Sequence, residues 1–555
     1  MDRKVSWIPT LLALLLFAAP ATATLVVVPG GFPTIQAAID SGADTVDVRD
    51  SLPPERLTVS RCVTIEPAAK DGFEGGAGWV SMPRIQSLEL GPPSSDLSVR
   101  VRGMHFLGQV RSTLTGHLIG FEGCRFDSGF AAPTATVGLF SSIRDCLFLG
   151  DVSIAGYAQF IGNTVLGGTL TFWADGLHDI RDNYVQGPAK EGMNLSVQDS
   201  GGSVSYNTIR GTSTGIHYLG DEGGSLTSHN EISDCSSDGI YYDLILHIDA
   251  ECDSNLIQRC GGAGIAGRVG SEGPGDARLR GNVIRHVGGS GIDLPECFVS
   301  SCDNQIVNAG EDGINAGLLR QLKHNVVGQC RGTGIRVSGE IVQATGNTIY
   351  SCGGPGIDVT EAFGIIDSLF NNISAFNGGP GLHFGGSHLD LQRLGCNDWF
   401  GNGGGPTVGI SPAASDLELD PRFCSLSTGD VQLAANSPLL AAPGCGLIGA
   451  LGVGCGATAA IAPADTDRPS VFQARPVPAR GAVEFELPTA TAASRLEVFD
   501  VIGAVRWQAT IPAGATRVQW DAHDAGGRRA PPGVYFARLT RAGAPLVTVR
   551  VVLAK

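Results

Sequence analysis

The stretch NVVGQCRGTGIRV begins at Asn325, and a related stretch, NTIYSCGGPGIDV, begins 22 residues later at Asn347. Eight segments of this form lie between residues 207 and 384, and their first Asn residues are 21 to 27 positions apart. The repeated positions are Asn207, Asn230, Asn255, Asn282, Asn304, Asn325, Asn347 and Asn371, with weaker copies at Asn163 and Asn183. A steady period of this length indicates a chain that stacks one structural unit on the next.

Each repeat holds two short runs in which apolar and polar residues alternate, bounded by Gly, Asn and Asp. Such alternation is typical of strands and not of helices. A unit this short cannot bury its apolar face alone, so we expect identical units to stack and to pair strand on strand. Glycine at the corners would supply backbone with positive φ, which accounts for 79 glycines among 555 residues. Stacked Asn side chains would add amide hydrogen bonds between coils.

A second motif is the run VPGGFPTIQAAIDSGADTVDV, which begins at Val28. With the repeats, it resembles the right-handed parallel β-helix, or pectate-lyase-like, superfamily. Many of its members open with a Phe-Pro-Thr-Ile-Gln element, a short helix that caps the solenoid, and here this element occupies Phe32 to Ile39. The resemblance covers roughly residues 24 to 456. It implies an all-β, right-handed parallel β-helix solenoid, but it is poorly specific for activity.

The chain is predicted to have five parts. Residues 1–23 have the features of a secretory signal peptide: Arg3 and Lys4, then an apolar run, then the cleavage site Ala21-Thr22-Ala23. Residues 24–395 would form the β-helix with its N-terminal capping helix, 396–456 its C-terminal closure, 457–470 a linker and 471–555 a second module. We therefore expect a secreted or cell-surface bacterial protein without a transmembrane segment after signal cleavage.

The C-terminal module contains five strand-like runs separated by turn residues, which predicts a small antiparallel β-sandwich. The pattern Trp520-Asp521, then Gly533-Val534-Tyr535-Phe536, resembles the Ig-like domain of flagellar-hook capping proteins and the C-terminal sorting domain of type IX secretion. The Pro-Asn-Pro usual at its start is replaced by Arg475-Pro476-Val477-Pro478. The resemblance implies an export machinery as partner, and a plain accessory Ig-like domain is the alternative.

The 14 cysteines all lie beyond the cleavage point. Cys235, Cys260, Cys330 and Cys352 each follow their repeat's Asn by five residues, which predicts a ladder of buried thiols. For the closure we predict the bridges Cys445–Cys455 and Cys396–Cys424. No pair of cysteines has the spacing of a zinc site.

Residues that directly follow each Gly-Ile pair should form a column on one outward face of the solenoid. Its last three members, Arg336, Asp358 and His383, would lie on successive coils about 5 Å apart. A carboxylate between Arg and His is a candidate acid–base group on a carbohydrate-binding groove, the location that enzymes of this fold use. The alternative is a solvent-facing ion pair between neighbouring strands.

A cation site is a further candidate, since Asp293 and Glu296 recur as Asp358 and Glu361 three coils later. Their oxygens are ligands that Ca²⁺ prefers. The active-site strings of polygalacturonase-like hydrolases and of pectate lyases are absent from the sequence.

Two functions follow. The first is a secreted or surface-displayed protein that binds polysaccharide or another cell-envelope component. The alternative is a carbohydrate-active enzyme, a polysaccharide lyase or glycoside hydrolase. The net charge of −16 argues against nucleic acid as partner. Because residues 471–555 hold 11 Lys and Arg against 6 Asp and Glu, the acidic excess lies in the solenoid, where an acidic polysaccharide would need bridging cations.

Overall fold

The computed structural model describes most of the chain from residue 23 onward. The described residues are 23–49, 52–68, 82–90, 98–112, 118–131, 141–156, 158–174, 178–197, 202–220, 226–244, 249–269, 275–359, 365–385, 388–389, 394–456, 473–475, 482–487, 494–500, 505–524, 527, 529–530, 533–540 and 547–553. The predicted signal peptide up to residue 22 and the linker 457–470 lie outside them.

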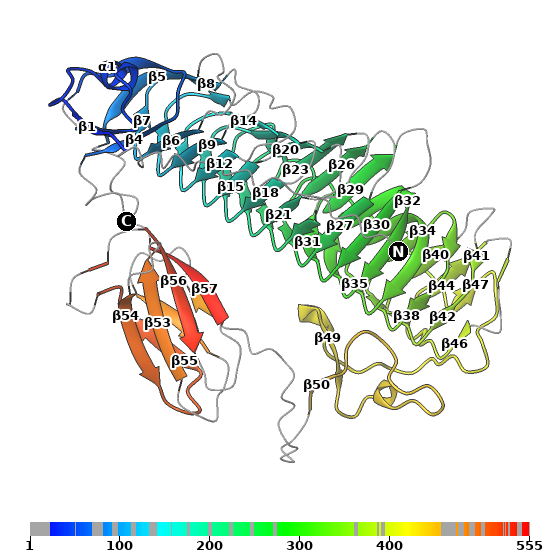
Figure 1. Ribbon diagram of the computed structural model, residues 1–555. Coiled ribbons are helices and arrows are strands. Elements are labelled where there is room, and N and C mark those ends of the chain that lie inside the picture. The colour runs from blue at the N-terminus through cyan, green and yellow to red at the C-terminus, as the bar shows by residue number, and fades with distance from the viewer. Residues whose placement is uncertain are drawn as a thin grey trace, which may run out of the picture.

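A parallel β-solenoid forms the first part of the chain, as predicted (Figure 1). Strands β1 (Leu25–Val28) to β47 (Thr407–Val408) form one continuous system, and each strand pairs in parallel with its counterpart on the next coil. The apolar side chains of each coil point inward and are almost completely buried. The expected strand period of two is visible in β6 (Ser98–Arg102), where Val99 and Val101 are buried and Ser98 and Arg100 are exposed.

Three tracks of strands run along the solenoid. The track that carries the candidate site consists of β17 (Leu170–Ala174), β20 (Glu191–Val197), β23 (Thr214–Gly220), β26 (Ile240–Leu244), β29 (Ile265–Val269), the start of β32 (Ile292–Cys302) and of β34 (Ile314–Lys323), β36 (Ile335–Val337), β40 (Ile357–Val359) and β44 (Leu382–Phe384). The track that follows each repeated Asn consists of β16 (Thr164–Leu166), β19 (Tyr184–Gln186), β22 (Thr208–Arg210), β25 (Glu231–Ser233), β28 (Leu256–Gln258), β31 (Val283–Val287), β33 (Gln305–Ala309), β35 (Val326–Gly328), β39 (Thr348–Tyr350) and β43 (Ile373–Ala375). The third includes β15 (Ala158–Ile161), β18 (His178–Arg181), β21 (Ser203–Ser205), β24 (Leu226–Ser228), β27 (Asp249–Asp253), β30 (Asp276–Arg280), β38 (Ala344–Thr345) and β42 (Leu369–Phe370), with the ends of β32 and β34.

The predicted capping helix is present as α1 (Ile35–Asp40). The Thr34 side chain caps it by accepting a hydrogen bond from the Ala37 backbone N–H, and Ile35, Ala38 and Ile39 are buried. This helix covers apolar side chains of the first coils that would otherwise face water.

A ladder of buried Asn side chains runs through the solenoid, as the repeat predicted. Each amide Nδ2 donates to the Oδ1 of the Asn on the next coil, at 3.0 Å between Asn255 and Asn282, and to a backbone carbonyl behind it. The ladder begins one coil earlier than the Asn pattern, because the Cys146 backbone N–H donates to Asn163 Oδ1. It ends at Asp416, whose Oδ1 accepts from the Nδ2 of Asn397.

One residue of the predicted ladder is wrong. Asn372, not Asn371, is its member in the last repeat, and Asn372 Nδ2 donates to Asn397 Oδ1 at 3.0 Å. Asn371 instead occupies the corner just before the ladder position, with φ +56°. That corner requires left-handed backbone in other coils too, for example at Ser254 and at Gly281. Two consecutive Asn residues satisfy both requirements, and so the repeat pattern alone did not distinguish them.

The predicted thiol ladder is confirmed as buried, unbridged cysteines at Cys235, Cys260, Cys330 and Cys352. On the following coils Asn377 and Asn402 take over this position as a second, short amide ladder. The Cys352 backbone N–H donates to Asn377 Oδ1 at 2.9 Å, so the two ladders share one column.

The closure contains two disulfides, but the predicted pairing is wrong. The bonds are Cys396–Cys445 and Cys424–Cys455. The reason is the short sheet of β48 (Phe423–Ser425), β49 (Asp430–Ala434) and β50 (Val453–Cys455). Cys424 lies on β48 and Cys455 on β50, and the Cα atoms of the two residues are 5.7 Å apart, within the range of a disulfide.

The closure has two roles. Residues around Trp399, Ile410 and Ala413 pack on the apolar end of the last coil. The segment from 417 to 456, which we call the clasp, turns back and lies against the outside of β35, β39 and β43 (Figure 1). There Val431 packs on Val326 and Tyr350 in a small apolar cluster.

The C-terminal module forms two antiparallel sheets, in agreement with the expected β-sandwich. One holds β51 (Gln473–Arg475), β52 (Val483–Glu486) and β55 (Arg517–Trp520), and the other β53 (Ser494–Asp500), β54 (Val505–Ile511), β56 (Gly533–Thr540) and β57 (Val547–Leu553). Both contribute to one apolar core around Trp520, Phe485 and Val498. Among all described residues, no helix has the length and apolar character needed to cross a membrane.

Candidate ligand-binding face

The outward side chains of the β17-to-β44 track form a surface that we call the site face. The strand register aligns one residue per coil in the column Thr171, Asn194, His217, Tyr241, Ala266, Asp293, Asn315, Arg336, Asp358 and His383. At a strand spacing of about 4.8 Å, this column is about 43 Å long. The predicted column is therefore present in the structure, in the expected order.

The structure brings Arg336, Asp358 and His383 together. Arg336 donates from Nη1 to Asp358 Oδ2 at 2.9 Å, and His383 Nδ1 lies 3.3 Å from Asp358 Oδ1. Arg336 also donates from Nε to Asp312 Oδ2 at 2.7 Å and from Nη2 to Thr333 Oγ1 at 2.9 Å. Asp312 and Thr333 were not among the predicted site residues.

This network constrains the chemistry available to its members. The Asp358 side chain is only 7% exposed, and its two oxygens face Arg336 and His383. The carboxylate is therefore placed to orient its neighbours rather than to react with a ligand. Arg336 and His383, at 44% and 39% exposure, are the members that a ligand can reach.

A second polar cluster, centred on Glu191 and His217, lies on the same face. His217 Nδ1 lies 3.0 Å from Glu191 Oε1, and Glu191 Oε2 accepts a hydrogen bond from Asn194 Nδ2 at 2.8 Å. The His217 and Tyr241 rings contact each other, with centroids 5.2 Å apart. Two buried polar atoms here, His217 Nε2 and Asn194 Oδ1, have no hydrogen-bond partner.

Both clusters have the same construction, which the sequence could have revealed. Glu191 and Asp312 each directly precede the glycine of their coil, as in Glu191-Gly192. Their partners His217 and Arg336 stand two residues after the glycine of the next coil. A carboxylate before the glycine of one coil and a basic residue after the glycine of the next coil is thus a pattern that the sequence shows. The two clusters lie about 24 Å apart, five coils along the face.

Two aromatic side chains extend the site face. Trp173, on β17, is 49% exposed, and Tyr241, on β26, is partly exposed beside His217. Burial and the charge of Asp243 raise the pKa of the Tyr241 hydroxyl, while Arg268 lowers it to a smaller degree. The hydroxyl therefore stays protonated at neutral pH and can donate a hydrogen bond.

The three candidate Ca²⁺ ligands that the structure describes, Asp293, Glu296 and Asp358, do not form one cluster. Asp293 and Asp358 lie three coils apart, about 14 Å, which is too far for one ion. Asn315 Nδ2 donates to Asp293 Oδ1 at 2.8 Å. Glu361 lies outside the described residues. Among the His, Cys, Asp and Glu residues that the structure describes, no group of three is placed to hold a metal ion.

The site face is acidic. Among the described residues on these strands and directly before them, carboxylates outnumber cations: Glu191, Asp238, Asp243, Asp293, Asp312 and Asp358 against Lys190, Arg268 and Arg336. A negative surface of this kind repels polyanions unless cations intervene.

Comparison with known proteins supports the class of fold. Residues 148–294 match the family model described as "Right handed beta helix region". With the parallel coils, this match identifies the fold as a right-handed parallel β-helix. A search of curated proteins found no match.

Solved structures with some likeness include pectate lyase Pel9A, at 15% identity and a TM-score of 0.28, over 69% of this chain and 100% of that one. The A-module of mannuronan C-5 epimerase AlgE4 from Azotobacter vinelandii has 14% identity and a TM-score of 0.24, over 70% and 95%. The AlgE6 A-module from the same organism has 12% identity and a TM-score of 0.20, over 68% and 95%.

Proposed function

We propose that the protein binds an extended, neutral polysaccharide along the site face. The observation that carries this proposal is the column of outward side chains, one per coil from Thr171 to His383, which includes the partly exposed ring of Tyr241 and lies beside the exposed ring of Trp173. A long row of hydroxyl-rich units needs this combination of polar groups and apolar ring faces.

The charge of the face supports a neutral rather than an acidic glycan. Arg336, the cation nearest to Asp358, is already held by two carboxylates, Asp312 and Asp358. Its charge is thus more than neutralised before any ligand arrives. Tyr241 and Asn315 offer uncharged hydrogen-bonding groups in the same column.

Affinity electrophoresis in gels containing glucan, xylan, mannan, polygalacturonate or alginate tests the proposal. We expect retardation by at least one neutral polysaccharide, and none by the acidic ones without Ca²⁺. Trp173→Ala and Tyr241→Ala should each weaken binding about tenfold, the effect of losing roughly 1.4 kcal/mol of contact.

The matched control is Tyr206→Ala. Tyr206 is 54% exposed and stacks on His229 away from the site face, at the corner before Asn207. We expect this variant to bind as the wild type does. Equal losses in Tyr206→Ala and Tyr241→Ala, or retardation by the acidic polysaccharides alone, would contradict the proposal.

A second candidate function, a carbohydrate-active enzyme, is favoured by the two His–carboxylate pairs. The hydrogen bond between His217 and Glu191 orients an imidazole by a carboxylate, a common arrangement in acid–base catalysis. His383 Nδ1 lies 3.3 Å from Asp358 Oδ1, close enough for an ion pair. Under this alternative, bound polysaccharide would be shortened, and His217→Ala or His383→Ala would stop the shortening while binding persists. Intact polysaccharide after long incubation would exclude it for that substrate.

We also propose that the protein is exported and that its C-terminal module directs it to the cell surface. Support comes from the sequence: the signal-peptide features of residues 1–23 and the sorting-domain pattern around Trp520 and Gly533. Fractionation of cells that express the chain with or without residues 471–555 tests this. We expect surface material only with the full chain, and equal surface amounts for both forms would contradict the address role.

A further inference from the structure

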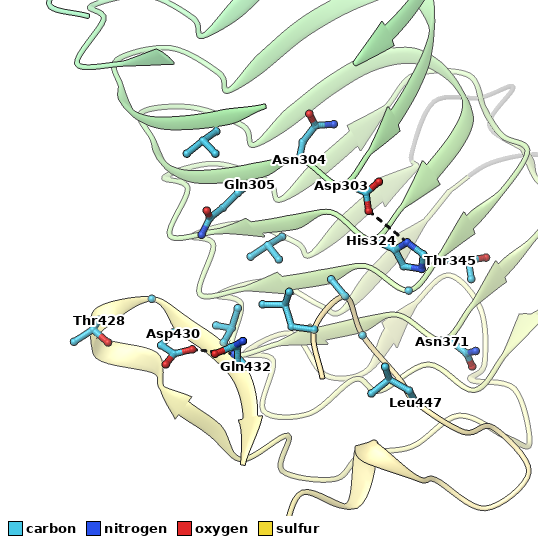
Figure 2. A pocket seen from close by; sticks show the side chains of 18 residues that line it. Asp303, Asn304, Gln305, His324, Thr345, Asn371, Thr428, Asp430, Gln432 and Leu447 are labelled. Carbon is cyan, nitrogen blue, oxygen red and sulfur yellow. Dashed lines mark hydrogen bonds and ion pairs between the residues drawn. The ribbon is translucent and has the colours of Figure 1, made fainter. Parts of the chain in front are cut away.

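A cavity of about 780 Å³ lies away from the site face, between the clasp and the outside of the coils (Figure 2). Gln305 and the Asp303–His324 pair line it from the coils, and Thr428, Asp430 and Gln432 line it from the clasp. Its volume is in the range of roughly 300–1,000 Å³ that is typical of small-molecule sites.

Backbone corners, hydrogen bonds and a disulfide hold the two walls of the cavity. On the coil side, Asp303 and His324 occupy left-handed corners of the solenoid, with φ +56° and +53°. The clasp is held by hydrogen bonds from the Ala450 backbone N–H to Thr348 Oγ1 and from the Gly449 backbone N–H to the Asn371 carbonyl, both at the edge of the cavity. The bond Cys424–Cys455 ties the two outer strands of the clasp together.

The character of the clasp–coil contact changes at this cavity. One wall of the cavity is apolar and closed: Val326 and Val431, which line it, are buried against each other and against Tyr350. At the cavity, polar side chains face each other from segments more than 100 residues apart, and most are exposed to solvent. A purely structural contact would gain stability by extending the apolar cluster instead.

The lining determines the class of ligand. Asp303 is already balanced, because its carboxylate lies 3.6 Å from His324 Nδ1 and 3.8 Å from Arg280 Nε. Asp430 accepts a hydrogen bond from the Gln432 backbone N–H and adds a negative charge to the other wall. This wall disfavours anions, while the carboxylates, amides and hydroxyls suit a ligand rich in hydroxyl groups. Leu447, which is 42% exposed, and Val326 supply apolar surface in the same cavity.

We propose that this cavity is a second carbohydrate site, which takes a short segment of a neutral oligosaccharide. It is independent of the site face, because the two share no residue and lie on different strand tracks. The protein would therefore hold two glycan segments at once.

Calorimetric titration of the full mature chain with cellohexaose, xylohexaose and mannohexaose tests this inference. We expect two binding sites per chain for at least one of them. Leu447→Trp should narrow the cavity and weaken one site at least tenfold. Leu419→Trp is the matched control, because Leu419 is equally exposed at 41% on the clasp but does not line the cavity. It should keep both sites.

The outcomes separate this inference from the proposed function. Loss of one site in Leu447→Trp and of the other in Tyr241→Ala supports both. A single site that Tyr241→Ala removes and Leu447→Trp leaves intact overturns the cavity and retains the site face. A single site that Leu447→Trp removes and Tyr241→Ala leaves intact overturns the site face and retains the cavity. Equal behaviour of the two Trp variants, or no binding of any hexasaccharide, overturns the cavity proposal.

Discussion

Individual buried polar residues hold the coils in register. Each ladder Asn makes hydrogen bonds on both sides, so that removing one side chain leaves several buried groups without a partner. Asn372 illustrates this: its Oδ1 accepts from the Nδ2 and backbone N–H of Asn347, and its Nδ2 donates to Asn397 Oδ1 and the Ala344 carbonyl. An unsatisfied buried group costs about 1–3 kcal/mol.

We predict that Asn372→Ala lowers the free energy of unfolding by about 3 kcal/mol or more. The matched variant is Asn371→Gly, which removes the neighbouring side chain but keeps the left-handed corner accessible. It should change stability by less than about 1 kcal/mol. Urea unfolding measures both. A larger loss in Asn371→Gly than in Asn372→Ala would contradict the corrected ladder.

A buried carboxyl group couples the closure to pH. Asp398 is completely buried, and its Oδ1 accepts a hydrogen bond from the Leu419 backbone N–H. Burial raises its pKa from 3.8 to about 7, and the charges of Asp420 and Glu418 add to the rise. Between these values the folded protein keeps a proton that the unfolded chain has lost. The contribution of Asp398 to the free energy of unfolding is therefore fully present below pH 3.8, and it is lost as the pH rises through about 7.

Asp398→Asn removes this titration while keeping an oxygen for the Leu419 N–H. We predict that the free energy of unfolding of the variant increases relative to that of the wild type as the pH rises from 4 to 8. The increase should be about 4 kcal/mol at most, the equivalent of a three-unit shift in pKa. Unfolding curves at a series of pH values measure the difference. A constant difference across this range would contradict the buried, protonated state of Asp398.

At the scale of elements, the closure is where sequence reasoning was least complete. The four bridged cysteines were identified, but their pairing depends on β48 to β50, whose order cannot be read from spacing. The same applies to the clasp: outward Val326 and Tyr350 look like exceptions to the strand pattern until Val431 is seen to cover them. The contacts of a segment that folds back along the coils are not periodic, and so a repeat analysis does not predict them.

Non-reducing peptide mapping should find Cys396 linked to Cys445 and Cys424 linked to Cys455. The double variant Cys424→Ala/Cys455→Ala should lose about 3 kcal/mol of clasp stability, because the bond closes a loop of 31 residues. Limited proteolysis should then cut the clasp before the coils. Cys235→Ala/Cys260→Ala is the control, since both thiols are unbridged and lie within the coils. Peptides that link Cys445 to Cys455 would contradict the observed closure.

At the scale of the whole molecule, periodicity made the solenoid predictable. Stacked coils repeat the same contacts, so that a single alignment of Gly-Ile pairs placed Arg336, Asp358 and His383 beside one another. The sequence did not predict three partners of the column residues: Asp312, Thr333 and Glu191. These residues precede the glycine of their coil, and only the turn of the chain at that glycine brings them beside the column. Contacts between residues at the same repeat position can be predicted from the sequence, whereas contacts between residues at different repeat positions become visible only in the structure.

Hydroxyl-radical footprinting of the mature protein, with and without the neutral polysaccharide that binds it best, tests the central claim most directly. Trp173, Tyr241 and His383 are reactive, accessible side chains that span the site face, and Tyr206 reports on a different surface. We predict protection of the first three and unchanged reactivity of Tyr206. Protection of Tyr206, with Trp173 and Tyr241 as reactive as in the free protein, would show that the site face is not where the polysaccharide binds.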